Sequence, residues 1–216
     1  MKSFFRELSY DLREPGIHIW MIPCAAMLFL SLSYWIQTTL DASGHVNAIT
    51  LSSMEIIIPS IGGYGAMMLM QGLLDTEGGE IAFTYRRTNL YWGLLRQIRF
   101  FLLFTILVAA VCLAVSHMMR ITFFSVFPLT LAQCFAVMGV SFLGITLSRQ
   151  TGIGLIVLVA FVSIQITLGR EFPLFNFIYS LDGTVPTPEA ASYIIYRCFI
   201  IGGFAWGIGQ IWVHPK

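Results

Sequence analysis

Six long apolar segments alternate with short polar intervals along the chain. Each segment is close to the roughly 20 residues that a helix needs to cross the hydrocarbon core of a bilayer. Strands of a membrane barrel would alternate polar and apolar residues, so only helices fit. The sequence therefore predicts an all-α integral membrane protein whose six transmembrane helices span residues 17–40, 54–74, 100–116, 121–148, 152–169 and 191–213.

Residues 1–16 show a different pattern, in which apolar and charged positions are segregated around a helix. At 100° per residue, one face carries Phe4, Phe5, Leu8 and Leu12, and the charged residues lie elsewhere. This pattern is typical of a helix that lies in the membrane interface with its aromatic face toward lipid. Pro15-Gly16 then turns the chain toward the first crossing.

Composition supports the membrane assignment. Hydrophobic residues make up 57% of the chain and charged residues 11%, whereas a soluble domain carries roughly 25% charged residues. The crossings use most of the 216 residues, so we expect a single membrane domain over residues 1–216. The net charge of +1 gives no indication of nucleic-acid binding.

Lysine and arginine positions predict the orientation. With six crossings both termini lie on one side, which would hold Lys2, Arg6, Arg13, Arg86, Arg87, Arg96, Arg99, Arg149 and Lys216. The other side would hold only Arg120, Arg170 and Arg197. Because cytoplasmic loops are enriched in positive charge, we expect both termini and the loop at residues 75–99 to be cytoplasmic, in a plasma or bacterial inner membrane.

Two loops are then predicted on the outer side. Residues 41–53 form a hydrophilic turn region. Residues 170–190 contain FPLFNFIYSL, an apolar piece too short to cross the membrane. This piece is either a re-entrant or interfacial helix pair or a loop folded over the end of the bundle.

Several kinds of chemistry find no support in the sequence. The only lysines are Lys2 and Lys216, so there is no Walker A phosphate loop. The four histidines stand apart from one another, and all four cysteines fall inside apolar segments, where we expect buried small hydrophobes. We therefore expect no catalytic residue, no metal site and no cofactor site in this chain, and no enzymatic activity of its own.

Few polar side chains are expected deep in the bilayer. Glu55 is predicted near the outer end of its helix, as an interfacial anchor or a partner for Arg120, Arg170 or Arg197, with a substrate contact as the alternative. Three glutamines are expected to hydrogen-bond between helices: Gln71, Gln133 and Gln165. With neither an ATP site nor an ion-coupling site, uphill transport would need energy from another polypeptide.

The loop at residues 75–99 is the most charged interval between two apolar segments. It contains three carboxylates and four arginines: Asp75, Glu77, Glu80, Arg86, Arg87, Arg96 and Arg99. Residues 77–85 can form a short helix, and Thr88 can cap a second one. The break between them would expose Thr84-Tyr85-Arg86-Arg87, either as a surface for a partner or as solvated charges that anchor the helix ends.

The order of these elements resembles that of the membrane (permease) subunit of ABC transporters of the type-2 (exporter) family. The local match is Glu77-Gly78-Gly79-Glu80-Ile81-Ala82-Phe83-Thr84-Tyr85, which is similar to the family's segment of Gly and Glu before a short helix and a Thr. Arg86-Arg87 stand where the family commonly has Pro.

The resemblance implies a coupling helix at residues 79–87 that docks on a separate cytoplasmic ABC ATPase subunit, which would bind ATP and Mg. The contact residues would be Glu80, Thr84, Tyr85, Arg86 and Arg87. A second permease copy or a paralogue would complete a dimer in the lipid membrane, and its cargo would be a hydrophobic or amphipathic peptide, lipid or drug. The alternative is a six-helix membrane protein without transport, such as an immunity or sensory component.

Glycines in two segments permit close helix contacts. They lie in Gly62-Gly63-Tyr64-Gly65 and at the GxxxG spacing of Gly203 and Gly207. Packing within the chain and dimerisation both remain open as explanations.

Overall fold

The computed structural model of the chain describes residues 46–74, 91–168, 176–178 and 187–213. These residues form α3 (Val46–Leu74), the π-helical turn η1 (Tyr91–Leu95), α5 (Arg96–Met119), α6 (Phe123–Ser148), α7 (Thr151–Leu168) and α8 (Pro188–Val213). Within the described ranges the structure contains helices and no strand, which confirms the all-α class.

Four of the described helices are long and apolar enough to cross a membrane, and α7 is apolar but shorter. The chain is therefore a membrane protein. At 1.5 Å per residue the 18 residues of α7 cover about 27 Å, just under the hydrocarbon thickness. The predicted crossing at residues 17–40 lies outside the described residues, as do residues 1–16 with Phe4, Phe5, Leu8 and Leu12, so a total of six crossings stays a prediction.

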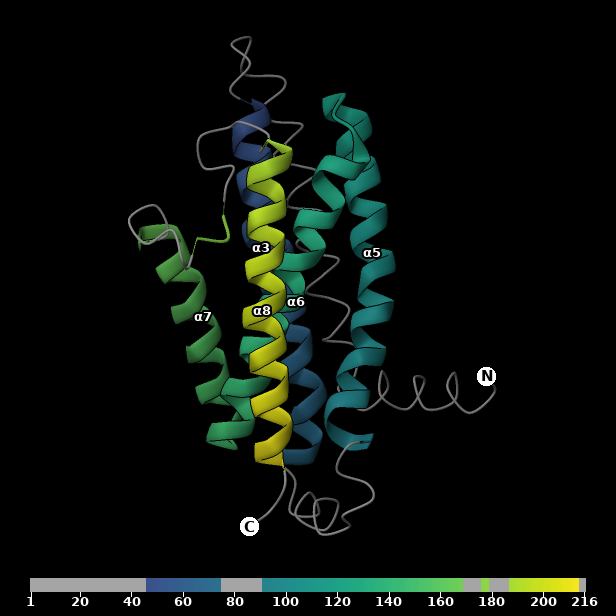
Figure 1. The fold of residues 1–216 in the computed structure, drawn as a ribbon. Helices are drawn as coiled ribbons and strands as arrows, with labels where there is room; N and C mark the ends of the chain where they lie inside the picture. Colours follow the sequence, from purple (N-terminus) through teal and green to yellow (C-terminus); the bar gives the residue numbers. More distant parts are fainter. Residues whose placement is uncertain (1–45, 75–90, 169–175, 179–186, 214–216) are drawn as a thin grey trace, which may run out of the picture.

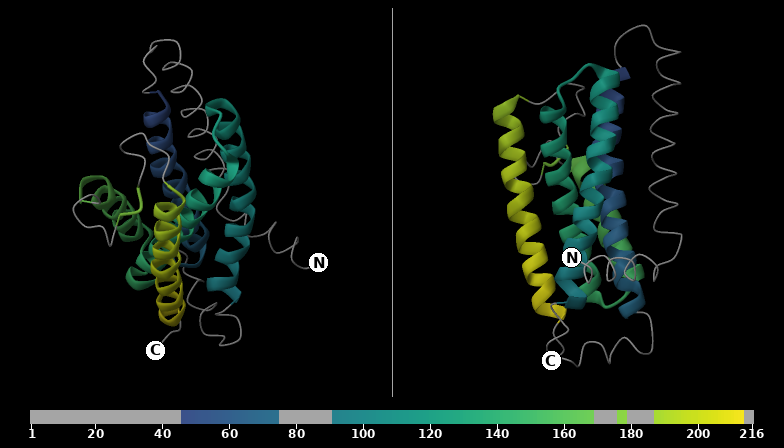
Figure 2. Two further views of the ribbon diagram at one scale, coloured as in Figure 1. Left: turned by 45° about the horizontal axis from the view of Figure 1, so that its top comes forward. Right: turned by 90° about the vertical axis from the view of Figure 1, so that its right-hand side faces the viewer.

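The helices alternate in direction along the chain (Figure 1). We call the end where α3, α6 and α8 finish the lower end, and the opposite one the upper end. α6 is the central helix: it packs against α3, α5, α7 and α8 and lies between α8 and α3 in Figure 2. Side chains on the outer faces of α7 and α8 are apolar and exposed, including Ile156 and Phe204, as expected for surfaces that face lipid.

Small residues allow α6 and α8 to approach closely. A Cβ added to Gly139 would lie 2.3 Å from the Trp206 ring and 2.9 Å from the carbonyl oxygen of Gly202. The Trp206 ring stacks on that of Phe135 with centroids 5.4 Å apart, and its Nε1 donates to the Phe135 carbonyl at 3.1 Å. This contact joins the two helices near their middle.

The two glycine segments have different surroundings. Added Cβ atoms at Gly63 and Gly65 would meet α5, α6 and α7 within 3.0 Å, so packing within the chain accounts for these glycines. Gly203 and Gly207 are exposed, and an added Cβ there would meet nothing within 4 Å in the described part of the chain.

Left-handed arginines end two of the helices. Arg120 (φ 56°) follows α5 and Arg149 (φ 53°) follows α6. The Arg149 N–H donates to the carbonyl of Ile145 at 2.8 Å, which satisfies one of the last carbonyls of α6. The polar turns at Arg120 and Arg149 interrupt the apolar runs sharply. The predicted crossings 121–148 and 152–169 therefore agree with α6 and α7 to within two residues.

Three of the observed helices begin earlier than the predicted crossings do. Residues 46–53, predicted as a turn, are the start of α3. Residues 91–99, predicted in the charged interval where Thr88 could cap a second helix, form η1 and the first turn of α5. Residues 188–190, predicted in the outer loop, begin α8. The last start has a clear local cause. Pro188 occupies the first helical position, where its missing N–H costs nothing, and the Thr187 hydroxyl accepts the N–H of Ala190 at 3.4 Å.

Candidate functional site

The residues predicted to contact an ATPase subunit lie outside the described part of the chain. These are Glu80, Thr84, Tyr85, Arg86 and Arg87. The described residues instead show two groups of buried polar side chains. One surrounds a cavity in the upper half of the bundle, and the other lies at the lower end, where α5 begins.

The cavity has a volume of about 20 Å³ and is lined by three helices and a non-helical segment. Its lining combines apolar side chains with the polar groups of Glu55, Gln133 and Gln165. The non-helical segment contributes Phe177 and Ile178, which are both buried. A space of this size holds about one water-sized body.

Two glutamines hold the backbone of a single residue, Phe177. Its N–H donates to Oε1 of Gln165 at 3.0 Å, and its carbonyl accepts a hydrogen bond from Nε2 of Gln133. Irregular backbone at membrane depth persists only where its polar groups are satisfied inside the protein. We expected Gln133 and Gln165 to form hydrogen bonds between helices. Instead, both bond to a non-helical segment between α7 and α8.

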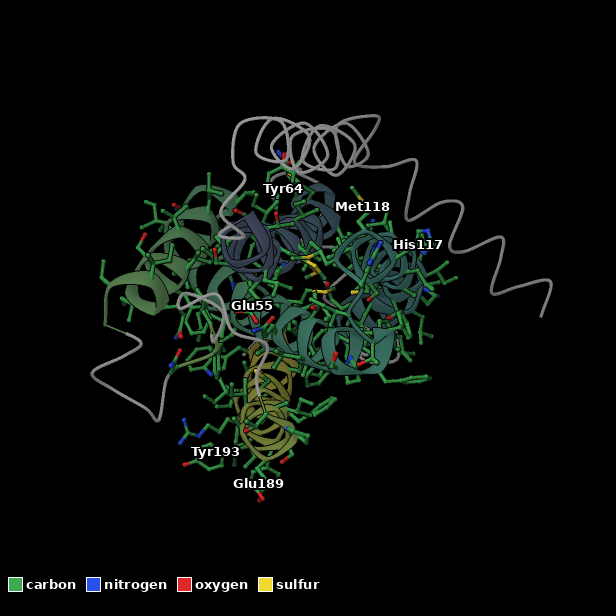
Figure 3. The ribbon with its side chains drawn as sticks, turned by 90° about the horizontal axis from the view of Figure 1, so that it is seen from above. Glu55, Tyr64, His117, Met118, Glu189 and Tyr193 are labelled. Carbon is green, nitrogen blue, oxygen red and sulfur yellow. The ribbon has the colours of Figure 1, made fainter. Side chains whose placement is uncertain are left out.

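Glu55 differs from its prediction as an interfacial anchor. It is 7% exposed, and it lies nine residues into α3, about 14 Å below the upper end of that helix. Figure 3 shows it in the middle of the bundle, whereas Glu189 and Tyr193 lie at the periphery on α8. Arg197, one of its expected partners, has Cζ 3.6 Å from the centroid of the Tyr193 ring.

Pro59 contributes to the same wall of the cavity. Proline has no N–H, so it cannot donate the usual helical hydrogen bond to the carbonyl four residues earlier, which is that of Glu55. α3 nevertheless continues through Pro59 to Leu74. Pro59 thus removes one backbone donor from α3 one turn after Glu55, at the wall of the cavity.

The cysteines agree with the expectation of buried, unbonded thiols. Cys112, Cys134 and Cys198 are free and buried. In the part of the chain that the structure describes, no group of three or more His, Cys, Asp or Glu side chains is placed to hold a metal ion. The polar chemistry of the cavity is thus that of one carboxylate and amide groups.

The second polar group joins the start of α5 to two other helices. The N–H of Leu94, in η1, donates to Oε1 of Gln210 on α8 at 2.7 Å. Nε2 of Gln97 donates to the carbonyl of Ala66 on α3, also at 2.7 Å. We call residues 94–99, together with these contacts to Gln210 and Ala66, the α5 foot.

Two arginines predicted in a solvated loop belong to the α5 foot instead. Arg96 is 1% exposed and Arg99 is also buried. Arg96 continues the buried stripe of Phe100, Phe104 and Val108 at intervals of four residues. The periodicity was visible in the sequence, but the positive charge favoured a loop, because long polar side chains are rarely buried.

The sequence also held signals for the upper cavity. Gln133 sits in the interior of a predicted crossing, where polar side chains are costly and face other protein groups, whereas Glu55 was predicted near the outer end of another. Their convergence with residues 177–178 depends on how three helices pack, which no local pattern specifies.

Comparisons of the chain with protein-family models, with curated proteins and with solved structures give no match. The family resemblance of the charged loop therefore rests on the sequence pattern alone.

Proposed function

We propose that this chain is the permease subunit of an ATP-driven ABC exporter and that a separate cytoplasmic ATPase subunit docks on residues 79–87. The observation that supports this best is the α5 foot. The chain that emerges from the charged loop is bonded within a few residues to α8 through Leu94 and to α3 through Gln97. A displacement of the loop would therefore be transmitted to α3, α5 and α8 together.

The local helix geometry favours the same role. Residues 91–95 form a π-helical turn at the junction between the loop and α5, and π-helical turns are frequent at functional sites. The ATP-bound partner can favour one packing of the bundle over another only if it binds the two packings with different affinity. The α5 foot would transmit a movement of the docked loop to α3 and α8 through these hydrogen bonds.

The rest of the proposal follows the sequence pattern. Both termini are cytoplasmic, the membrane is the plasma or inner membrane, and a second permease copy or a paralogue completes the transporter. The cargo is hydrophobic or amphipathic, such as a peptide, lipid or drug. The described interior offers few charged groups to recognise a polar solute.

The direct test is affinity capture of the tagged chain from detergent-solubilised membranes of its source cell. We expect an ATPase subunit with a Walker A motif to co-purify in stoichiometric amount. The combined variant Glu80→Ala, Arg86→Ala, Arg87→Ala should lose it. Arg149→Ala is the matched control, because it removes an exposed positive charge from another loop at the same end.

Equal recovery of the ATPase with all three chains would contradict docking at residues 79–87. Absence of any ATPase from a stably folded wild-type preparation would contradict the transporter assignment. It would favour the alternative, a six-helix immunity or sensory component.

A further inference from the structure

One charged side chain lies on the outer, apolar surface of α8. Arg197 belongs to a helix that is long and apolar enough to cross a membrane, and it is half-buried. Positions 197, 204 and 208 follow one another at helical spacings, so Arg197 shares a face with Phe204 and Ile208, which are both exposed. A cation on such a face is costly unless it reaches the membrane interface or meets an opposite charge.

The guanidinium of Arg197 is turned toward the upper end of α8. Its Cζ lies 3.6 Å from the centroid of the Tyr193 ring, and Tyr193 is one helical turn nearer to Pro188, where α8 begins. Tyr193 is exposed, and Figure 3 shows it at the edge of the bundle. The ring therefore holds the positive charge along the outer surface in the direction of the interface, as in the snorkelling of long basic side chains.

The length of α8 places this charge close to the lipid headgroups. Its 26 residues cover about 39 Å, whereas the hydrocarbon core is about 30 Å thick. With the surplus shared between the two ends, the Cα of Arg197 lies about 9 Å inside the hydrocarbon and that of Tyr193 about 3 Å inside. A guanidinium stacked on Tyr193 thus lies just below the phosphate groups of the leaflet at the upper end.

Stacking leaves the hydrogen-bond donors of the guanidinium unused. The five N–H groups of arginine lie in the plane of the group and point outward from its edge, whereas the Tyr193 ring covers only a face. Among the described residues the guanidinium has no carboxylate partner and no hydrogen-bond acceptor. Glu189, the acidic residue of α8, lies two turns away. Such a planar set of donors matches the oxygens of a phosphate, which can accept two parallel hydrogen bonds.

We propose that Arg197, stacked on Tyr193, binds the phosphate group of a phospholipid in the leaflet at the upper end of α8. The acyl chains of this lipid run down the apolar face of Phe204 and Ile208. A phospholipid fits better than a soluble anion or a carboxylate of another protein, because α8 carries no further charge from Arg197 down to Val213. The site goes beyond the exporter function and does not depend on an ATPase partner.

The test is native mass spectrometry of the full-length chain, delipidated in detergent and titrated with dioleoyl phosphatidylglycerol. Dioleoyl glycerol, which has the same acyl chains and no phosphate, should bind at least about tenfold more weakly, the scale for losing hydrogen bonds to a charged group. Arg197→Gln should weaken phosphatidylglycerol binding by the same factor. Arg120→Gln is the matched control, because it removes an exposed positive charge at the same end of the bundle, and it should bind the lipid as the wild type does.

The role of the ring is tested separately. Tyr193→Phe keeps the aromatic face and should keep the affinity for phosphatidylglycerol. Tyr193→Leu removes the cation–π contact and should weaken binding about threefold. Equal binding by these two variants would overturn the stacked site.

A second variant covers the case in which Arg197→Gln does not fold. Arg197→Lys keeps the charge but loses the planar fork of donors, so it should bind phosphatidylglycerol more weakly than Arg120→Lys does. If Arg197→Lys binds as tightly as Arg120→Lys, or if the wild type binds dioleoyl glycerol as tightly as phosphatidylglycerol, the proposal is overturned.

The remaining outcomes identify another occupant. Equal lipid affinity of the wild type and Arg197→Gln would mean that water alone solvates the guanidinium. Displacement of the lipid by inorganic phosphate would assign the arginine to a soluble anion. A wild-type dimer that Arg197→Gln dissociates, with lipid binding unchanged, would assign it to a second copy of the chain. Each of these three results would overturn the phospholipid site.

Discussion

The upper cavity and the α5 foot both bury polar side chains in an apolar bundle, but they use them differently. At the α5 foot, Gln97 and Gln210 each bond to the backbone of a neighbouring helix. At the cavity, Gln133 and Gln165 hold one non-helical residue. The first arrangement ties helices together, and the second builds the wall of a small space.

The charges of the two regions are also opposite. The α5 foot buries guanidinium groups, Arg96 and Arg99, and the cavity buries the carboxylate of Glu55. Oε1 of Gln97 at the α5 foot and Oε1 of Gln133 at the cavity both accept no hydrogen bond from a described group. Only at the cavity does such an oxygen share a lining with a carboxylate, that of Glu55, and this distinguishes the two regions.

The largest effect is expected at the contact between α6, which lines the cavity, and α8, which carries Gln210 of the α5 foot. Gly139→Val would drive a side chain into the Trp206 ring and the Gly202 carbonyl. We expect a loss of about 3 kcal/mol of stability, since overpacking of a close contact cannot relax against backbone. Unfolding in SDS, followed by circular dichroism, measures the loss. Gly203→Val faces no neighbour within 4 Å among the described residues and should change stability little; equal losses would contradict the α6–α8 packing.

Gln133→Leu tests the cavity alone. It leaves the Phe177 carbonyl without the bond that Gln133 donates, and an unsatisfied buried acceptor costs about 2 kcal/mol. The same unfolding assay applies, with Gln150→Leu, an exposed glutamine just below α6, as the control. An unchanged midpoint for Gln133→Leu would mean that the Phe177 segment is not held as described.

Gln210→Leu tests the α5 foot and should cost less. It removes the acceptor of the Leu94 N–H, but at the end of the bundle water can replace part of the bond, so we expect about 1 kcal/mol. Hydrogen exchange of the Leu94 amide should rise well above that of the wild type. Retained protection would show that Gln210 is not its main acceptor.

Arg149→Gly should produce the smallest change, and one of opposite sign. Arg149 adopts a left-handed conformation after α6, which glycine adopts without a Cβ penalty. We expect a gain of about 0.5 kcal/mol, seen as a higher thermal midpoint, and a similar gain for Arg120→Gly at the opposite end. A loss in both variants would show that the arginine side chains stabilise these ends.

The sequence predicted the helical class because long apolar runs permit little else in a bilayer. It placed α6 and α7 almost correctly, where turns interrupt the apolar pattern sharply. It failed at α5, where Arg96 continues a buried stripe but was assigned to water because of its charge. Thr187-Pro188 is a typical helix start, but the crossing was predicted to begin at residue 191, where the apolar run starts.

The candidate cavity was less accessible to prediction. Glu55 and Gln133 were recognised as deep or nearly deep polar residues, but their meeting with Phe177 depends on the packing of α3, α6 and α7. That arrangement follows from glycine contacts along α3 and α6, whose partners lie far away in the sequence. The predicted coupling residues stay a prediction, since they lie outside the described part of the chain.

One measurement tests most directly whether the charged loop drives the bundle through the α5 foot. Leu94→Cys and Gln210→Cys, in a chain whose four native cysteines are replaced by alanine, would be joined by a short thiol cross-linker in the complex purified with its ATPase. The account predicts that vanadate-sensitive ATP hydrolysis falls strongly on cross-linking, and that a pair placed at exposed positions of α7 has no such effect. Undiminished hydrolysis with η1 fixed to α8 would contradict it.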